Sequence, residues 1–344
     1  METPNIFNYA TSELSQDAFI LWFLDWANPN YASKDEFLYE TAQCFVHSLL
    51  GNNDIQITSI KCDKQKLHID IFVVVNDQYF ILIEDKIHTT EHGLQMTKYS
   101  QEIDKVDEFK NLQKICVYLK TGNESAEHLD IINKGYNEKN TGWTFRFFLR
   151  KDFLEIIKKY EGSNSILLDF REKLENIEKD FLSYRRLPIN EWSWAAWQGF
   201  YTELANHIPD LWWGSVNPKS GAFMCAAWSQ IQNKDCILKL QLEGYSKDTE
   251  LKKSRLCIKI QIPNDKKLER SNLMFSLYGE LKKIADSCQI KLNKPKRYSY
   301  IGKVLTLACV EIDKIIYGEF DINRILLNID KYEELIKCVE FKSI

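Results

Sequence analysis

The sequence predicts an α/β domain built on a mixed β-sheet flanked by helices, followed by an α+β domain with antiparallel strands. Two almost wholly apolar runs, 66–75 and 79–86, lack a polar face, which indicates a sheet covered by helices on both sides. The patterns around them follow the order α-α-β-β-β-α-β-(α)-β-α-α, which is typical of a mixed sheet between helices. Strand patterns follow one another after Arg185-Arg186-Leu187-Pro188, so we expect domains of 1–184 and 185–344.

The first domain is expected to begin with two helices, at 11–27 and 35–50. Thr11 or Ser12 offers an N-cap for the first helix, and Gly51 follows the second in the usual C-terminal position. The expected strands are 54–62, 66–75, 79–86, 114–120 and 144–150. The expected later helices are about 90–106, part of 122–142, 151–160 and 165–184.

The turn between the two apolar runs decides where their charged residues lie. A three-residue turn at 76–78 would pair Val75 with Tyr79 and set Asp70 directly across from Glu84. Their Cβ atoms would then be about 5 Å apart, close enough for both carboxylates to share one cation. A two-residue turn would aim the carboxylates apart, so the chemistry favours the three-residue turn.

The second domain is expected to mix helices with antiparallel strands. The expected helices are 190–208, 271–289 and 321–339, and the expected strands are 212–216, 222–231, 235–245, 255–263 and part of 297–311. The tryptophans of this half are expected in its core, with base stacking as the alternative; they are Trp192, Trp194, Trp197, Trp212, Trp213 and Trp228.

Composition narrows the class of protein. A chain of 344 residues with 44 % hydrophobic and 27 % charged residues is typical of a globular protein in water. No apolar run is long enough to span a bilayer, and the start METPNIFNYATSELSQ lacks the features of a signal peptide. The nine cysteines are scattered and form no C-x-x-C pair, which favours reduced thiols and a cytoplasmic location.

Charge differs between the two halves. The net charge is −4, but residues 1–183 hold 20 Lys and Arg against 30 Asp and Glu, whereas 184–344 hold 25 against 19. An acidic half that gathers cations and a basic half that holds phosphates would divide the work of a nucleic-acid enzyme. The alternative is a drift in charge without functional meaning.

Ionisable residues interrupt the apolar strands where burial of an unpaired charge would be costly. Asp70 stands in the first run, Glu84-Asp85-Lys86 close the second, and Gln95 and Tyr99 follow one helical turn apart. In these residues the chain resembles the PD-(D/E)XK nuclease superfamily, and is most similar to bacterial members whose core reads roughly I-D-I…I-E-D-K…H…Q-L-x-x-Y. The segment 11–19, TSELSQDAF, also resembles the opening helix of that group. The likeness covers about residues 5–120, and His68-Ile69 stand where the superfamily often has a proline.

The resemblance implies a restriction-endonuclease-like core and Mg²⁺-dependent hydrolysis of phosphodiester bonds, with Mn²⁺ able to substitute. The expected activity is a DNA endonuclease that serves in defence against foreign DNA, and pairing into a homodimer is a reasonable expectation. The implied catalytic residues are Asp70, Glu84, Lys86, Gln95 and Tyr99.

The implied metal ligands are oxygen donors, the kind that Mg²⁺ prefers; they are Asp70, Glu84, the main-chain carbonyl of Asp85, and Glu13, with Asp17 as a substitute for Glu13. Lys86 beside them would orient or deprotonate the attacking water, or stabilise the charge that develops on the phosphate.

Two other functions compete with this one. His88-Thr89-Thr90-Glu91-His92 matches H-x-x-E-H, the inverted zinc-protease motif, although His88 comes directly after a strand and Gly93 weakens the helix. His92 is then interpreted as a residue that lines the nuclease site or caps the helix. The second competitor is a catalytically degenerate nuclease fold whose basic half binds nucleic acid or a protein partner.

The segment whose composition best suits contact with nucleic acid is 291–303, in which basic and aromatic residues are mixed. With Ile290 before it, the segment reads IKLNKPKRYSYIGK. Its candidate nucleic-acid contacts, Lys294, Lys296, Arg297 and Lys303, are interleaved with Tyr298 and Tyr300. The segment is interpreted either as a loop that contacts phosphates or as a solvated turn.

Overall fold

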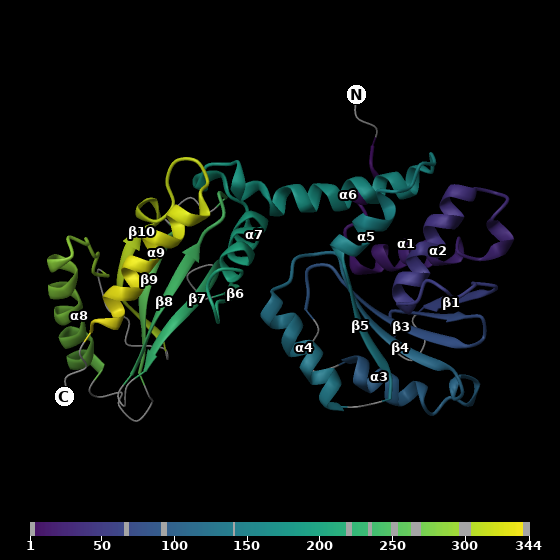
Figure 1. The fold of residues 1–344 in the computed structure, drawn as a ribbon, viewed down its shortest axis with the longest axis horizontal. Helices are drawn as coiled ribbons and strands as arrows, with labels where there is room; N and C mark the ends of the chain where they lie inside the picture. Colours follow the sequence, from purple (N-terminus) through teal and green to yellow (C-terminus); the bar gives the residue numbers. More distant parts are fainter. Residues whose placement is uncertain are drawn as a thin grey trace. The chain divides into compact units, whose positions relative to one another are not determined.

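The computed structural model describes residues 4–64, 69–90, 95–139, 142–217, 222–232, 236–248, 254–262, 270–295 and 304–339. Contacts between residues divide the chain into two compact units, Met1–Glu178 and Lys179–Ile344 (Figure 1). The division falls inside the long helix α6 (Ser165–Phe181).

The N-terminal unit follows the predicted order of elements. Its helices are α1 (Glu13–Asp25), α2 (Glu36–Leu50), α3 (Gln95–Ile103), α4 (Ala126–Lys139), α5 (Arg150–Ile157) and most of α6. Its strands are β1 (Ile60–Lys64), β2 (Ile71–Val75), β3 (Tyr79–Lys86), β4 (Gln113–Lys120) and β5 (Thr144–Leu149).

Local signals place the first two helices. Ser12, one of the two predicted caps, accepts a hydrogen bond from Ser15 N at the start of α1. Asp35 caps α2 in the same way, and Gly51 ends α2 with a left-handed backbone (φ 65°), as predicted.

The sheet of this unit has five strands in the order β1-β2-β3-β4-β5. The pairs β1·β2 and β2·β3 are antiparallel, whereas β3·β4 and β4·β5 are parallel, so the sheet is mixed. The carboxyl ends of β3, β4 and β5 therefore meet at one edge. In α/β folds such an edge is where binding and catalytic residues commonly lie.

Helices cover both faces of this sheet (Figure 1). Apolar residues of α1, α2, α5 and α6 form one core cluster with the face that carries Ile71, Val73, Ile81 and Ile83. Residues of α3 and α4 form a second cluster with the opposite face, which carries Phe72, Val74, Phe80 and Leu82. The prediction of a sheet flanked by helices is confirmed.

The expectation of a strand from residue 54 was wrong for residues 54–59. The side chain of Asn76, in the β2–β3 turn, accepts hydrogen bonds from the main-chain N–H groups of Thr58 (2.7 Å) and Ser59 (3.1 Å). These two donors are used by a side chain, and β1 begins only at Ile60.

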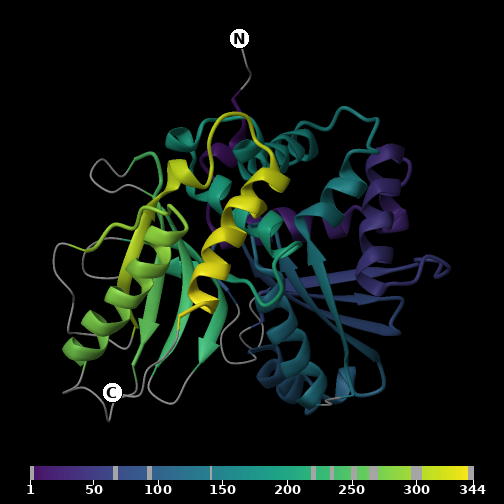
Figure 2. The same ribbon diagram turned by 60° about the vertical axis from the view of Figure 1, so that its left-hand side comes forward.

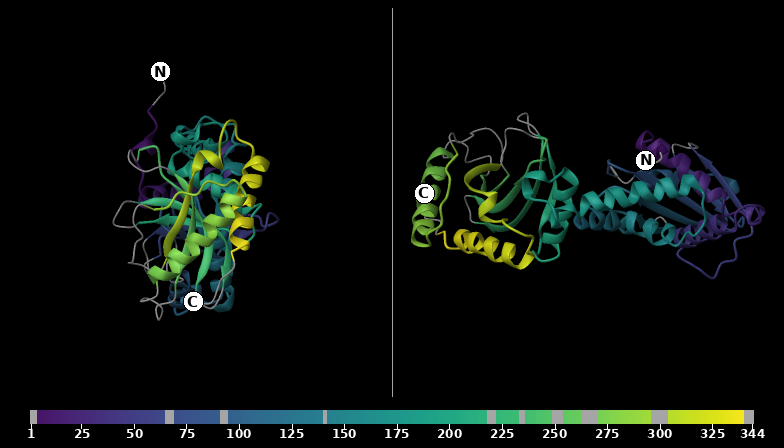
Figure 3. Two further views of the ribbon diagram at one scale, coloured as in Figure 1. Left: turned by 90° about the vertical axis from the view of Figure 1, so that its left-hand side faces the viewer. Right: turned by 90° about the horizontal axis from the view of Figure 1, so that it is seen from above.

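The C-terminal unit has a second sheet that is antiparallel throughout, in the order β10-β9-β8-β7-β6. Its elements are α7 (Trp194–Ala205), β6 (Trp212–Val216), β7 (Phe223–Gln232), β8 (Ile237–Gly244), β9 (Arg255–Gln261), α8 (Arg270–Ser287), β10 (Val304–Glu311) and α9 (Ile322–Lys337). Figure 2 and Figure 3 show α8 and α9 beside these strands, and α7, α8 and α9 all contribute to one core with the sheet.

Most tryptophans of this unit are buried, as predicted. Trp192, Trp197 and Trp228 are at most 1 % exposed, whereas Trp212 is 41 % exposed. The opposite face of the sheet holds a buried ion cluster, in which Glu243 receives Lys259 Nζ at 2.6 Å and Arg255 Nε at 2.8 Å.

Two further features concern the whole described chain. The cysteines, all of which lie in the described ranges, are not joined in disulfides. In the same ranges no helix is both long and apolar enough to cross a bilayer.

Candidate active site

The turn between β2 and β3 sets the register of the hairpin. Asn76 and Asp77 adopt left-handed conformations, with φ of 57° and 51°, a region that Asn and Asp tolerate better than most residues. Val75 pairs with Tyr79 across the turn. The predicted three-residue turn is therefore confirmed.

The same register brings the acidic residues of the two strands together. The last pair in the ladder is Ile71 with Ile83, so one further step sets Asp70 across from Glu84. Asp70 lies just before β2, and its Oδ2 accepts a hydrogen bond from the main-chain N–H of Asp85 at 3.3 Å. Asp70 is thereby tied to the end of β3.

The end of β3 distributes its three charged residues between two faces. Glu84 and Lys86 alternate with Asp85, so they share the face covered by α3 and α4, while Asp85 points toward α1. All three are buried, at 1 %, 9 % and 1 % exposure in the order Glu84, Lys86, Asp85. Because burial of an unpaired carboxylate is costly, the acidic residues at this strand end require a cation close to them.

Lys86 supplies that cation. Its Nζ lies 2.5 Å from Glu84 Oε1, 3.2 Å from the carbonyl oxygen of Asp85 and 3.7 Å from Asp70 Oδ2. Three oxygen atoms from two strands thus surround one positive charge. The ammonium group marks a position that suits a cation.

The pKa values of this cluster reflect burial and mutual charge. Burial raises the pKa of Asp70, although the positive charge of Lys86 opposes the rise. Burial by itself would lower the pKa of Lys86, but its hydrogen bond to Glu84 and the charges of Glu84 and Asp70 outweigh burial and raise it.

Glu13 contacts the segment that follows β3. Its Oε1 accepts hydrogen bonds from the main-chain N–H of Ile87 (3.1 Å) and from Thr89 Oγ1 (2.6 Å). Burial alone would raise the pKa of Glu13, but the hydrogen bonds from Thr89 and Ile87 outweigh it and the pKa is lowered. Glu13 is thus near the site as a carboxylate that holds the start of the β3–α3 connection.

Asp17 lies one turn further along α1 and is only 6 % exposed. Burial, together with the negative charge of Asp70, raises the pKa of Asp17 to about 6, and burial and the negative charge of Asp17 in turn raise the pKa of Asp85. Two acidic side chains from different elements therefore lie together behind the strand end.

The helix that carries Gln95 and Tyr99 packs on the face of the sheet that Glu84 and Lys86 share. Gln95 is the first residue of α3, and Tyr99 is partly buried against the same apolar cluster as Met96. Both residues therefore come from the helix that covers the face of Glu84 and Lys86.

Several predicted residues lie outside the described residues. They are Glu91 and His92 of the H-x-x-E-H segment, and Lys296, Arg297 and Lys303 of the basic segment. His88 is described and lies in the connection after β3, not in a helix. Lys294, in the C-terminal unit, is exposed, and its Nζ lies 4.6 Å from the ring centroid of Phe275.

Sequence reasoning missed three polar residues at the same sheet edge. Lys120 is the parallel neighbour of Lys86, is 1 % exposed, and donates a hydrogen bond to the carbonyl of Thr89. Gln16 and Thr121 are both fully buried and linked to Asp85. Lys120 was detectable, because a parallel strand ending KICVYLK beside β3 sets its last lysine next to Lys86; Gln16 and Thr121 carry no comparable signal.

A metal ion at this site would find carboxylate and carbonyl oxygens as its donors. Within the described ranges, no group of three or more His, Cys, Asp or Glu side chains is arranged to hold a metal. Two carboxylates and one carbonyl oxygen nevertheless converge on the Lys86 ammonium. Oxygen donors of this kind, completed by water, fit the preference of Mg²⁺ or Mn²⁺.

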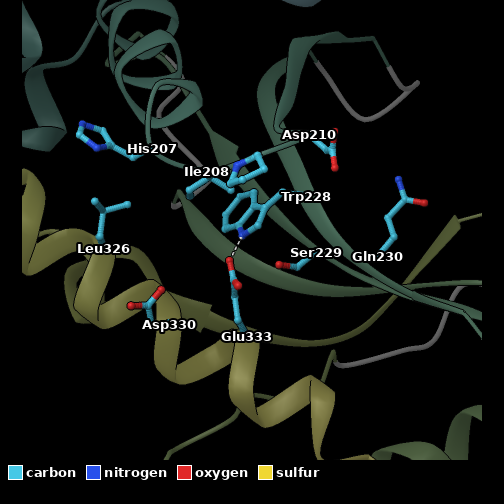
Figure 4. A pocket seen from close by; sticks show the side chains of 10 residues that line it. His207, Ile208, Asp210, Trp228, Ser229, Gln230, Leu326, Asp330 and Glu333 are labelled. Atoms are coloured by element: carbon cyan, nitrogen blue, oxygen red, sulfur yellow. Dashed lines mark hydrogen bonds between the residues drawn. The ribbon is translucent and has the colours of Figure 1, made fainter.

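A cavity of about 780 Å³ lies in the C-terminal unit, apart from the motif residues (Figure 4). Carboxylates of Asp210, Asp330 and Glu333 line it, and Trp228 Nε1 donates a hydrogen bond to Glu333 Oε1 at 2.7 Å. Its lining is acidic, so it does not favour phosphate.

The family model described as the PD-(D/E)XK nuclease superfamily matches residues 4–185. No curated protein and no solved structure matches the chain.

Proposed function

The chain belongs to the PD-(D/E)XK nuclease superfamily, and from that premise we propose that it is a nuclease that hydrolyses phosphodiester bonds with the help of a divalent metal. The observation that carries the proposal is the convergence of Asp70, Glu84 and the Asp85 carbonyl on the ammonium of Lys86. These groups would hold Mg²⁺, and Mn²⁺ would substitute for it. Glu13 is a further candidate ligand, either directly or through water.

The metal, when bound, supplies an activated water and charge stabilisation at the phosphate. The Lys86 ammonium would give up its present position to the metal and remain next to it on the same face of β3, where it would orient the water or stabilise the charge that develops on the phosphate oxygens. Gln95 and Tyr99, on α3, contact the phosphate of the strand to be cut or hold Lys86 in place. Cleavage in line with the attacking water leaves a 5′-phosphate.

We propose DNA as the substrate, cut internally, with a role in defence against foreign DNA. The basic charge of residues 184–344 supports a contribution of the C-terminal domain, 185–344, to substrate binding or to dimerisation. Lys294, one of the four candidate contacts in that basic segment, lies in the described ranges and is exposed to solvent. The proposed location is the cytoplasm, where such a substrate would be met.

The test is a cleavage assay on linear, circular and single-stranded DNA and on RNA, with Mg²⁺ or Mn²⁺ added. We expect Glu84→Ala and Lys86→Ala to abolish cleavage, because each removes a group that contacts the metal position. Lys114→Ala is a matched control, since the Lys114 side chain is 12 % exposed and paired with Asp104 at 2.5 Å, much as Lys86 is 11 % exposed and paired with Glu84. It should cleave as the wild type does.

Unchanged cleavage by both Glu84→Ala and Lys86→Ala would refute the proposal. Binding of nucleic acid without cleavage, and without uptake of Mn²⁺ in calorimetry, would favour a degenerate binding module. Stoichiometric Zn²⁺ in the purified protein, lost on His88→Ala, would favour the protease.

A further inference from the structure

Asp85, the middle residue of the Glu84-Asp85-Lys86 run, contacts the site through its main chain. Its N–H donates to Asp70 Oδ2 at 3.3 Å, and its carbonyl oxygen accepts from Lys86 Nζ at 3.2 Å. One peptide segment therefore orients a predicted metal carboxylate and also presents a predicted metal ligand of its own. The position of the Asp85 backbone controls both.

The Asp85 side chain leaves the opposite face of the strand and is held there by a buried amide. Gln16 Nε2, from α1, donates to Asp85 Oδ1 at 2.6 Å. Gln16 and Asp85 are 0 % and 1 % exposed, so water does not replace this hydrogen bond. Without Gln16, the Asp85 Oδ1 atom would be buried without this hydrogen bond, which is costly, so the Asp85 side chain would have to move.

The orientation of Gln16 is fixed from its other end. Thr121 Oγ1 donates to Gln16 Oε1 at 2.7 Å, which commits the amide oxygen to Thr121 and turns the NH₂ group toward Asp85. Thr121 is itself 0 % exposed, its N–H donates to the Lys86 carbonyl at 3.2 Å, and its carbonyl accepts from Arg150 Nη1 at 2.9 Å. Each member of the chain is anchored in a different element, α1, β3 and the segment after β4.

We propose that Gln16 and Thr121 are positioning residues of this site: acting through the Asp85 side chain, they hold the Asp85 amide and carbonyl where a metal would bind. The inference rests on the proposed function. If the inference holds, residues on the face of β3 opposite Glu84 and Lys86 influence the affinity for the metal without contacting it. Outer partners that orient metal ligands commonly contribute 10-fold to 100-fold to affinity.

The test measures Mn²⁺ binding to the full chain by electron paramagnetic resonance, without substrate, together with thermal unfolding. Gln16→Leu removes the donor, and Gln16→Glu keeps the shape but turns a carboxylate oxygen toward Asp85. Both should bind Mn²⁺ about 10-fold more weakly than the wild type. Thr121→Val should weaken binding in the same direction, and the double variant should lose less than the product of the two single losses, because both act on one hydrogen-bond chain.

Gln43→Leu is the matched control. Gln43 lies on the neighbouring helix α2, and its Nε2 donates to the Ala27 carbonyl (3.0 Å) and to Tyr39 Oη (2.8 Å), away from the site. Its loss should lower the melting temperature and leave Mn²⁺ affinity unchanged.

A Gln16→Leu or Gln16→Glu protein that is destabilised like Gln43→Leu, yet binds Mn²⁺ as the wild type does, would overturn the inference and leave the nuclease proposal standing. A wild-type chain that takes up no Mn²⁺ would overturn both. If Gln16→Leu does not fold, Gln16→Glu and Thr121→Val decide the question by the same measurement.

Discussion

Lys86 Nζ lies 2.5 Å from Glu84 Oε1, and the two side chains leave the same face of β3 two residues apart. They are 11 % and 2 % exposed, so the pair is almost closed to water. The ammonium occupies the point at which the carboxylates of Asp70 and Glu84 and the Asp85 carbonyl converge. A divalent metal at this point therefore competes with Lys86 for the same oxygens.

This competition predicts the behaviour of Lys86→Met. Without metal the variant should be less stable by on the order of 3 kcal/mol, because Glu84 loses the partner of a buried ion pair. Mn²⁺ should then raise its melting temperature by more than it raises that of the wild type, since no ammonium has to be displaced. For scale, a ligand at 100 times its Kd stabilises a protein by about 2.7 kcal/mol. Equal Mn²⁺ responses of the variant and the wild type, measured by differential scanning fluorimetry, would contradict the competition; Lys114→Met is the control.

A side chain at Gly122 is expected to disturb the backbone beside the site. A Cβ atom there would lie 1.8 Å from the carbonyl oxygen of Ile87, the residue after Lys86, so the backbone must shift. Gly122→Ala should destabilise the chain by about 1–3 kcal/mol and weaken Mn²⁺ binding in calorimetry. Gly279→Ala is the control, because a Cβ atom at this position in α8 meets nothing within 4 Å. This variant should bind Mn²⁺ as the wild type does, and its free energy of unfolding should rise by roughly 0.5–1 kcal/mol. Wild-type affinity in Gly122→Ala would show that the Ile87 backbone does not influence the site.

Glu243 predicts how the C-terminal unit responds to acid. Burial alone would raise the pKa of Glu243, but the charges and hydrogen bonds of Lys259 and Arg255 outweigh burial and lower it below its usual value of 4.5. A group with a lowered pKa contributes stability above its unfolded-state pKa and loses that contribution as the pH falls through the folded-state pKa. Urea unfolding of the wild type should therefore show a fall in stability below about pH 4.5 that is smaller in Glu243→Gln. The same acid slope in both proteins would show that this carboxylate does not contribute.

Asn76 predicts the cost of losing the hairpin turn. Asn76→Ala removes the acceptor for the N–H groups of Thr58 and Ser59 and puts alanine at φ 57°. The left-handed conformation alone costs roughly 1–2 kcal/mol for such a residue, so the free energy of unfolding in urea should fall by at least that amount. Gln78→Ala, at an exposed position of the same turn, should have little effect. Equal stability of the two variants would show that the turn does not depend on Asn76.

Local chemistry explains why many elements could be predicted. The run 79–86 was predicted as a strand with the bounds that β3 has, because turn residues precede it and its apolar residues are continuous. The turn was predicted from the requirement that two carboxylates meet, and the Val75–Tyr79 pair confirms it. The strand 212–216 matches β6, since Asn217 and Pro218 end the pattern.

Other boundaries depended on contacts that the sequence does not display. Residues 54–59 alternate polar side chains with Ile55 and Ile57, which suggests a strand, but the Asn76 side chain accepts hydrogen bonds from two of their main-chain N–H groups.

The order of elements, the hairpin register and the grouping of Asp70, Glu84 and Lys86 follow from residues close together in the chain, so they could be predicted from the sequence. The contacts that support this grouping become visible only in the folded chain. Gln16 and Asp85 are 69 positions apart, and Gln16 and Thr121 are 105 apart. No local pattern connects such residues, since their hydrogen bonds exist only after α1, β3 and β4 have packed together and excluded water. The Lys86 ammonium among three oxygens is likewise a product of that burial, which makes an ion pair there both close and strong.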